Sequence, residues 1–160
     1  MKMGSFRLEK VTKLPTTVEE AWTFFSDPAN LAVITPPEMH FRIKTKLRAG
    51  EFYQGMQIEY TVRPIAGIPV KWVSEITDVE PYRWFTDRQL VGPYASWNHK
   101  HEFRAVADGV EMRDVVDYSL PFGILGKFAN WVFVRGKLER IFNYREKRIR
   151  FLFNAGRATG

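Results

Sequence analysis

The feature of this sequence that most restricts its fold is a change in hydrophobic period along the chain. Between residues 39 and 120, apolar residues such as Met39, Phe41 and Ile43 alternate with polar neighbours in segments of about ten residues. A period of two places every second side chain on the same face, so each segment predicts a strand with one buried face. Short turns separate the segments, which indicates antiparallel pairing. The strands are expected at residues 39–48, 55–65, 69–79, 82–91, 95–107 and 110–120.

The N-terminal residues predict one more strand and two short helices. Residues 5–13 alternate in the same way and form the expected first strand. Thr17 and Glu20 have the spacing of a capping box, so a helix is expected to begin after Thr17 and to run through Phe25. A second short helix is expected at residues 29–33.

The last part of the chain predicts one long amphipathic helix. Pro121-Phe122-Gly123 ends the last strand, and residues 124–152 follow a period of 3.6. At about 1.5 Å per residue such a helix is about 40 Å long, enough to cross a small domain. The basic residues, Arg145 among them, are expected mostly outside the apolar stripe. The stripe contains Leu125, Phe128, Trp131, Val132, Val134, Leu138, Ile141, Phe142 and Ile149.

These elements together predict an α+β fold. A strongly curved sheet cannot be filled by its own side chains, so the long helix is expected to supply the missing wall. The expected architecture is a curved antiparallel sheet of about seven strands, with two short helices and one long C-terminal helix around a cavity. No repeat or linker divides the chain, so we expect a single domain at residues 1–153 and a flexible tail at 154–160.

Composition limits the class of protein. Aromatic residues make up 15% of the chain, which suits an interior lined by flat side chains or a ligand pocket. Cysteine is absent, so disulfides and thiolate metal sites are excluded, and the sequence fits a reducing compartment. The first ten residues have no apolar signal segment, and no run of 18 apolar residues occurs. We therefore expect a cytoplasmic protein.

The net charge of +6 raises nucleic acids and anionic membranes as partners. The basic residues are spread along the chain, so a solvated basic surface is the main interpretation. Nucleic-acid binding is not expected, because the aromatic residues are predicted to face inward rather than to form a stacking platform. The membrane partner that we retain is a weak contact between anionic lipid and the basic C-terminal helix.

The order of elements resembles the START-like helix-grip fold of the SRPBCC superfamily, which includes birch-pollen-allergen-like, polyketide cyclase and lipid-transfer proteins. The motifs that carry the resemblance are Phe85-x-Asp87-x-Gln89-x-x-Gly92-Pro93-Tyr94, Trp97-x-His99-x-His101-x-Phe103, Asp114, Tyr118 and Pro121-Phe122-Gly123-x-x-Gly126. They look like a bacterial branch described as cell-division-inhibitor-like. The resemblance implies a hydrophobic ligand in a cavity, no obligatory cofactor and no settled catalytic activity.

Strand arithmetic gathers polar residues on the inner face. Asp108-Gly109 predicts a two-residue hairpin turn that places His101 opposite Val116 and His99 opposite Tyr118, with Phe103 opposite Asp114. If the preceding hairpin is centred at Pro93, Asp87 lies opposite His99 and Phe85 opposite His101. A slip of one residue would move Asp87 to the other face.

Three interpretations of this cluster remain open. It is a hydrogen-bonded network that stabilises the sheet, a group that orients the polar end of a ligand, or a catalytic site. The candidate catalytic residues are His99, His101, Asp87 and Asp114. His-x-His on a strand also offers two imidazoles to zinc, with Asp87 or Asp114 as third ligand, but this pattern is a weak signal and we expect no metal site. No nucleophile elbow, phosphate-binding loop or metalloprotease helix occurs.

The function expected from the sequence is binding or transport of a small hydrophobic ligand, lipid-like, polyketide-like or aromatic, in an internal cavity. The alternative is a cyclase- or dehydratase-like enzyme that uses the histidine and aspartate cluster. The expected ligand-binding residues are Trp72, Phe85, Gln89, Trp97, His99, His101, Phe103, Met112, Asp114, Tyr118, Phe128, Trp131 and Val132.

Overall fold

The structure is a computed structural model that describes residues 5–46, 48, 50–64 and 67–157. Its elements in chain order are β1 (Ser5–Leu14), α1 (Val18–Phe25), η1 (Pro28–Asn30), α2 (Leu31–Ile34), η2 (Pro37–Met39), β2 (Arg42–Ile43), β3 (Gln57–Val62), β4 (Val70–Glu80), β5 (Trp84–Val91), β6 (Ser96–Val106), β7 (Gly109–Ser119), α3 (Gly123–Ala129), η3 (Asn130–Val134) and α4 (Arg135–Arg157). The elements η1 and η2 are 3-10 turns, and η3 is a π-helical turn.

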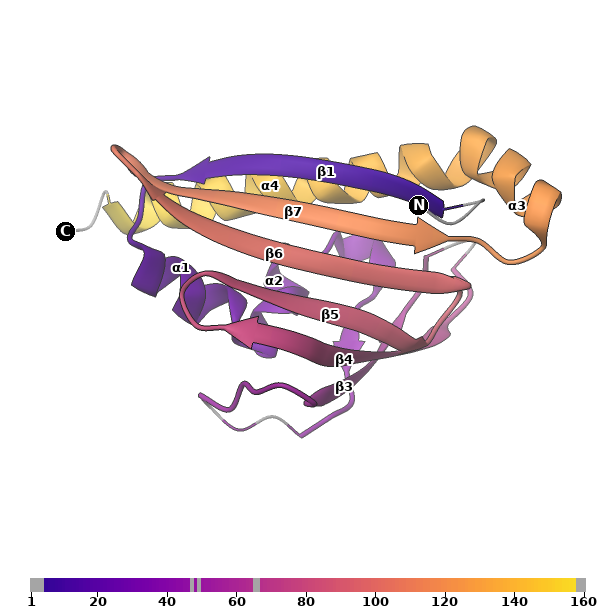
Figure 1. The fold of residues 1–160 in the computed structure, drawn as a ribbon, viewed down its shortest axis with the longest axis horizontal. Coiled ribbons are helices and arrows are strands. Elements are labelled where there is room, and N and C mark those ends of the chain that lie inside the picture. Colours follow the sequence, from indigo (N-terminus) through magenta and orange to yellow (C-terminus); the bar gives the residue numbers. More distant parts are fainter. Residues whose placement is uncertain (1–4, 47, 49, 65–66, 158–160) are drawn as a thin grey trace.

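The fold is an α+β helix-grip fold with a curved antiparallel sheet. The seven strands are arranged in the order β1-β7-β6-β5-β4-β3-β2. In Figure 1 the long helix α4 runs behind β1 and β7, and α1 and α2 lie behind the sheet toward the β6–β7 turn. The predicted fold class is confirmed.

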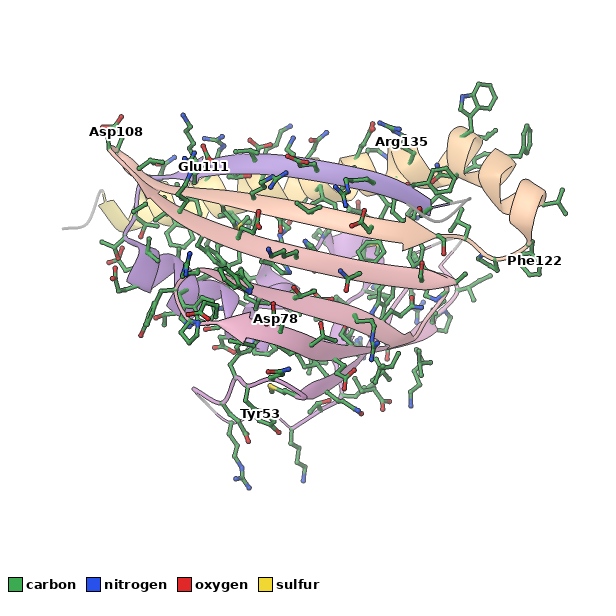
Figure 2. The ribbon with its side chains drawn as sticks, in the orientation of Figure 1. Tyr53, Asp78, Asp108, Glu111, Phe122 and Arg135 are labelled. Carbon is green, nitrogen blue, oxygen red and sulfur yellow. The ribbon has the colours of Figure 1, made fainter. Side chains whose placement is uncertain are left out.

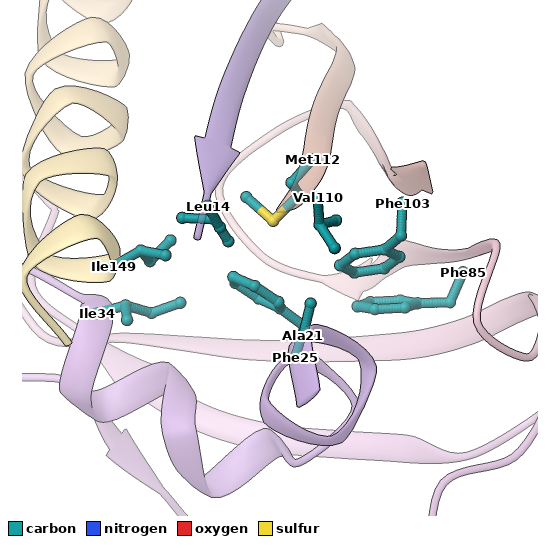
Figure 3. Close-up of a cluster of buried hydrophobic side chains, with 9 residues drawn as sticks. All are labelled: Leu14, Ala21, Phe25, Ile34, Phe85, Phe103, Val110, Met112 and Ile149. Carbon is teal, nitrogen blue, oxygen red and sulfur yellow. The ribbon is translucent and has the colours of Figure 1, made fainter. Parts of the chain in front are cut away.

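The capping box and the short helices form where the sequence predicts them. The Thr17 hydroxyl accepts a hydrogen bond from the Glu20 N–H, and the Glu20 side chain accepts one from the Thr17 N–H. This cap starts α1, which buries Ala21 and Phe25. Both side chains join a core cluster at the end of the sheet near the β6–β7 turn (Figure 3). The cluster contains Leu14, Ala21, Phe25, Ile34, Phe85, Phe103, Val110, Met112 and Ile149.

The predicted strand at residues 39–48 is wrong over most of its length. Only Arg42–Ile43 pairs with β3, whereas Pro37–Met39 forms a 3-10 turn. Pro37 begins this turn because its fixed φ suits the first helical position. His40 then adopts a left-handed φ of 45°, which breaks the extended chain. His40 is exposed, as predicted, and Leu47 lies outside the described residues.

The predicted pairing of β6 with β7 is shifted by two positions. The turn consists of Ala107 and Asp108, and Gly109 is the first residue of β7, opposite Val106. His101 therefore lies opposite Asp114, and His99 opposite Val116. Because the shift is an even number of residues, every side chain keeps its predicted face.

A close backbone contact explains why Gly109 does not take its expected turn position. Gly109 has a φ of 141°, and a Cβ at this position would lie 2.1 Å from the carbonyl oxygen of Leu14. The glycine thus admits the end of β1 beside β7. Of the two β5–β6 registers that the sequence left open, the structure has the one centred at Pro93, with Asp87 opposite His99 and Phe85 opposite His101.

The C-terminal helix is longer and less regular than predicted. It runs from Gly123 to Arg157 with a π-helical turn at Asn130–Val134, so residues 154–157 of the expected tail are helical. Residues 158–160 lie outside the described part. A π turn adds a residue per turn and rotates the apolar stripe. As a result Leu125, Phe128 and Trp131, predicted in the buried stripe, are exposed.

Candidate functional site

A cavity of about 800 Å³ lies between the sheet and the helices. Strands β3, β4, β5 and β6 form one wall, and α1, α2, η3 and α4 form the other. This volume is within the range of small-molecule sites, which are mostly apolar with a few polar groups. Six of the predicted ligand-binding residues line it: Trp72, Phe85, Trp97, His99, His101 and Val132.

Further aromatic residues of the wall were not singled out from the sequence. Phe41, Phe52, Tyr60 and Tyr94 all line the cavity. Tyr60 stacks on Trp72 with 5.9 Å between ring centroids. Tyr60 and Phe41 belong to segments of alternating apolar residues, so strand periodicity could have found both, whereas Phe52 and Tyr94 lie in connecting segments between strands.

Other predicted ligand-binding residues lie in the packed core or at the surface rather than in the cavity wall. Phe103 and Met112 belong to the core cluster. The Gln89 amide donates to the carbonyl oxygen of Tyr94 at 2.8 Å and so holds the β5–β6 turn. Phe128 and Trp131 are exposed on α3 and η3.

Tyr118 acts as a link between the sheet and the C-terminal helix. Its hydroxyl donates a 2.7 Å hydrogen bond to Asn130 Oδ1 at the start of η3. Both side chains are buried. Tyr118 therefore anchors the π-helical turn and supports the cavity wall from behind.

The predicted polar cluster forms around Asp114. Asp114 is 2% exposed, and its Oδ1 lies 2.9 Å from His99 Nε2 and 3.0 Å from His101 Nδ1. On the cavity side, Asp87 Oδ2 lies 3.2 Å from His101 Nε2 and 3.7 Å from His99 Nδ1. The two imidazoles thus lie between a deeply buried carboxylate and one at the cavity wall. The register of β5, β6 and β7 positions all four residues.

Arg145 of α4 completes the cluster, although the sequence interpretation placed it outside the buried stripe. Its Nη2 lies 3.6 Å from Asp114 Oδ1. Arg145 follows Phe142 by three residues and precedes Ile149 by four, so helical spacing places it on the same buried face. Among the described residues, Arg145 Nε is buried with no hydrogen-bond partner.

A line of hydrogen-bonding side chains runs from Asp87 across β4 to β3. We call this line, together with the histidine and aspartate cluster and Arg145, the polar strip. The Ser74 hydroxyl lies 3.4 Å from Asp87 Oδ1 and accepts a 3.1 Å hydrogen bond from Trp72 Nε1. The Tyr60 hydroxyl lies 3.4 Å from the same Ser74 oxygen. Burial raises the pKa of Tyr60, and the Asp87 charge adds to this shift, so its hydroxyl stays protonated.

Electrostatics gives the two histidines different protonation behaviour. Burial and the neighbouring His101 lower the pKa of His99 to about 4, against the opposing effect of the two carboxylates. Burial also lowers the pKa of His101, but its hydrogen bonds to Asp114 and Asp87 outweigh burial, so the net shift is upward. His99 is therefore the neutral imidazole and His101 the one whose protonated form is favoured.

The carboxylates are held in their ionised form. Burial opposes ionisation of Asp114, yet Arg145 and the two histidines hold its pKa well below the usual value. Burial also opposes ionisation of Asp87, but His101 and His99 lower its pKa. The charges of the two carboxylates are thus balanced by Arg145 and a protonated His101. The cluster can hold a polar group or move a proton at the cavity wall.

Comparison with known proteins gives structural relatives only. No family model matches the chain, and no curated protein sequence matches it significantly. The Zhui aromatase/cyclase of Streptomyces sp. R1128 superposes with a TM-score of 0.73 at 16% identity, over 94% of each chain. A START superfamily protein from Mycobacterium smegmatis gives 0.70 at 11% identity, over 93% of this chain and 97% of that one. Ara h 8.0201 gives 0.60 at 13% identity, over 91% and 98%.

The described helices set one limit on membrane interaction. None of them combines the length and the apolar character needed to cross a bilayer.

The structural relatives share the long C-terminal helix gripped by a curved sheet over nearly their whole length. At these identities the similarity shows the fold alone: the chain has the helix-grip fold of these structures.

Proposed function

We propose that this protein binds a small hydrophobic ligand that carries a hydrogen-bond acceptor at one end. The observation that carries the proposal is the cavity of about 800 Å³, with aromatic walls and a cluster of buried polar side chains at one side. Trp72, Trp97 and Phe85 supply flat apolar surface, which favours an aromatic, polyketide-like or lipid-like compound. The protein then acts as a carrier or binding module for that compound.

The acceptor group of the ligand is assigned to the strip beside Arg145. Arg145 lines the cavity, and its Nε has no hydrogen-bond partner among the described residues. A buried donor without a partner costs about 1–3 kcal/mol, so a ligand oxygen that accepts this hydrogen bond gains affinity. A carbonyl, phenolate or carboxylate oxygen fits this donor.

Native mass spectrometry and a cavity-filling variant test the proposal. Extraction of the purified protein should release a stoichiometric apolar compound, or added aromatic and fatty acids should quench the fluorescence of Trp72 and Trp97 saturably. Ile58 is buried and lines the cavity. Ile58→Phe should weaken binding by extending a ring into the cavity, whereas the equal-sized Ile58→Leu should bind normally. Equal binding by both variants would place the ligand elsewhere.

The enzyme alternative is a cyclase- or dehydratase-like activity. It is favoured by the contact of His99 and His101 with the cavity and by the similarity to an aromatase/cyclase. In this mechanism the histidine pair takes up and returns a proton of a substrate oxygen or α-carbon. Incubation with short poly-β-keto thioesters should then give cyclised product at a rate that His101→Gln reduces. Binding of such substrates without turnover would leave the carrier function alone.

A second proposal concerns contact with anionic membranes. Five large apolar side chains on and beside α3 and η3 are between 62% and 82% exposed. Figure 2 shows Phe122 at the corner between β7 and α3, with further side chains extending from this helix away from the sheet. We name this set the exposed apolar face; it consists of Phe122, Leu125, Phe128, Trp131 and Phe133.

The charge around the exposed apolar face selects an anionic lipid surface as its partner. Residues 121–138 contain three basic residues and no acidic residue. Aromatic side chains insert at the headgroup boundary while basic residues attract anionic lipid. Phe133 also lines the cavity. The cavity thus reaches the surface at this face, so a docked molecule can exchange a lipid-like ligand with the bilayer. We therefore propose the membrane contact at the start of the C-terminal helix, whereas the sequence had suggested the basic side of that helix.

Vesicle sedimentation tests the membrane contact. Binding to phosphatidylcholine vesicles should increase when phosphatidylserine is added. In the double variant F128S/W131S, each substitution should weaken vesicle binding about tenfold or more, because each removes an aromatic side chain that would insert into the bilayer. Phe151 is also exposed but lies near the other end of α4, so Phe151→Ser is the matched control. Binding that ignores both lipid charge and the double variant would contradict the proposal.

A further inference from the structure

Three residues with metal-binding side chains meet at the cavity wall. Asp87 of β5 and His99 and His101 of β6 line the cavity, and one ligand atom from each lies within 4.8 Å of the others. The strand register fixes this meeting, because Asp87 lies directly opposite His99 and His101 is the next residue on the same face. The sequence pattern alone did not decide the third ligand of the His-x-His pair, and we expected no metal from it.

Two of the three distances between ligand atoms are close to those around a tetrahedral ion. Asp87 Oδ2 lies 3.2 Å from His101 Nε2 and 3.7 Å from His99 Nδ1. Zinc binds nitrogen and oxygen ligands at about 2.0–2.2 Å, so neighbouring ligand atoms of a tetrahedral site are about 3.3–3.5 Å apart. These two separations lie on either side of this value, and the ligand nitrogens of His99 and His101 lie within 4.8 Å of each other. Binding an ion then requires the side chains to rotate until all three ligand atoms reach this spacing.

Asp114 orients both histidines for metal binding. Its Oδ1 lies 2.9 Å from His99 Nε2 and 3.0 Å from His101 Nδ1. An ionised carboxylate only accepts hydrogen bonds, so His99 Nε2 carries the hydrogen. His101 Nδ1 lies between Asp114 Oδ1 and Arg145 Nη2, at 3.0 Å and 3.4 Å, and in the tautomer that binds a metal it donates to Asp114. The other nitrogen of each ring is then directed toward Asp87. Histidines that bind metals typically donate their second N–H to a carboxylate in this way.

The charge of the cluster also favours a cation. With both imidazoles neutral, Asp87 and Asp114 carry two negative charges, and Arg145 supplies one positive charge beside Asp114. One negative charge is left at a largely buried position, where an uncompensated charge is costly. Either a proton on the histidine pair or a metal ion between the rings and Asp87 provides the compensation. The metal ion also uses the free lone pair of His99 Nδ1, which a proton on His101 leaves facing a carboxylate.

We propose that Asp87, His99 and His101 bind a divalent transition-metal ion, with Zn²⁺ as the first candidate, through Oδ2, Nδ1 and Nε2 respectively. Imidazole and carboxylate ligands suit zinc, although related ions also bind such sets. Three protein ligands leave a fourth position toward the cavity, as in zinc sites that bind an exchangeable molecule rather than in closed structural sites. This inference goes beyond the proposed ligand binding and does not depend on it.

Metal titration of the full chain tests the proposal. After removal of metals by a chelator, Zn²⁺ should bind at one ion per chain by native mass spectrometry. Co²⁺ should give the visible absorption bands of a tetrahedral site. Asp87→Asn and His99→Gln should each weaken Zn²⁺ binding more than about 100-fold, since loss of a ligand exceeds the 10–100-fold cost of losing an orienting partner. His40 is exposed and outside the cluster, so His40→Gln should bind as the unchanged protein does.

A measurement on the unchanged protein makes the test independent of the folding of the variants. X-ray absorption of the zinc-loaded chain should show two imidazole ligands and no sulfur ligand. A lack of stoichiometric Zn²⁺ binding, a metal shell without imidazole, or equal affinity in folded His99→Gln protein would overturn the proposal. Ile58→Phe should leave Zn²⁺ binding unchanged while it weakens the hydrophobic ligand, so each proposal can fail separately.

Discussion

The sheet has a packed end and a hollow end, and the same helix lies across both. At the packed end, near the β6–β7 turn, Leu14, Met112 and Ile149 meet between the sheet and α4 and are at most 1% exposed (Figure 3). At the hollow end, Trp72 and Trp97 surround a cavity of about 800 Å³. Alternation in a strand therefore determines which face is apolar, but not whether the space before that face is filled.

The polar cluster lies at the boundary between the two ends. Along β6, Phe103 belongs to the packed end and Trp97 to the hollow end, with His101 and His99 between them. Along α4, Arg145 lies between Ile149 and Phe142 in the same way. Sheet and helix thus change from apolar to polar at the same level. At the level where apolar side chains no longer fill the space between the sheet and the helix, the side chains that face this space are polar and need hydrogen-bond or charge partners.

Gly109→Ala is expected to have the largest effect, because it disturbs the backbone of the packed end. The new Cβ would lie 2.1 Å from the Leu14 carbonyl oxygen, at a φ of 141° that disfavours any side chain. We expect a loss of about 4 kcal/mol or more in the free energy of unfolding. Urea unfolding measures this loss. Near-normal stability would mean that β1 can move away from β7 at little cost.

Asp114→Asn tests the polar cluster at the boundary between the packed end and the hollow end. Asp114 is the shared partner of His99 and His101 and lies beside Arg145, and all these groups are buried or nearly so. Removing one charged partner from a buried ionic group costs about 3–5 kcal/mol, because the remaining charge is left without compensation. We expect about 3 kcal/mol in chelator-treated protein, measured by urea unfolding. A loss below about 1 kcal/mol would show that Arg145 reaches water or another partner.

The same substitution at the two ends compares packed and hollow space directly. Ile149 is 0% exposed in the core cluster, whereas Ile58 is 4% exposed and borders the cavity. Ile149→Ala should cost about 3 kcal/mol, because it leaves a new void among packed neighbours. Ile58→Ala should cost only about 1–2 kcal/mol, because one side of the side chain already lacks contacts.

Equal losses in the two isoleucine variants would contradict the comparison. They would show that the cavity closes in solution or holds a bound molecule that packs against Ile58. Repeating the measurement after denaturing extraction and refolding separates these two causes, since only a bound molecule is removed by that treatment.

Local signals predicted the parts of the fold that local chemistry determines. The Thr17–Glu20 capping box was identified correctly. The sequence left two registers open for the β5–β6 hairpin, and the structure has the one centred at Pro93, which brings Asp87 to His99. Gly109 was assigned to a turn because Asp-Gly favours one, whereas the structure uses this glycine for contact with β1. No local pattern reports a contact with a strand about one hundred residues away in the sequence.

For the candidate site, the sequence predicted which strand side chains share the inner face of the sheet. His99, His101 and Asp114 lie together as their alternation indicates, and Asp87 joins them through one of the two registers left open. On the helix, Val132 lines the cavity as predicted, whereas Phe128 and Trp131 are exposed. The π-helical turn at Asn130–Val134 shifts the phase of the stripe, so Trp131 is at the surface. A fixed period of 3.6 cannot represent that shift.

Gly136→Ala is expected to have the smallest effect and to sharpen the contrast between glycines at the two ends. A Cβ at Gly136 would meet only Arg140 Nη1 at 3.9 Å, which is ordinary contact at the end of a flexible side chain. Alanine is favoured over glycine within a helix by about 1 kcal/mol. We therefore expect a gain of about 0.5–1 kcal/mol and a Tm higher by about 1–4 °C, measured by calorimetry. A loss of stability here would mean that α4 needs a bare backbone at the cavity mouth, as it would if a ligand packed against Gly136.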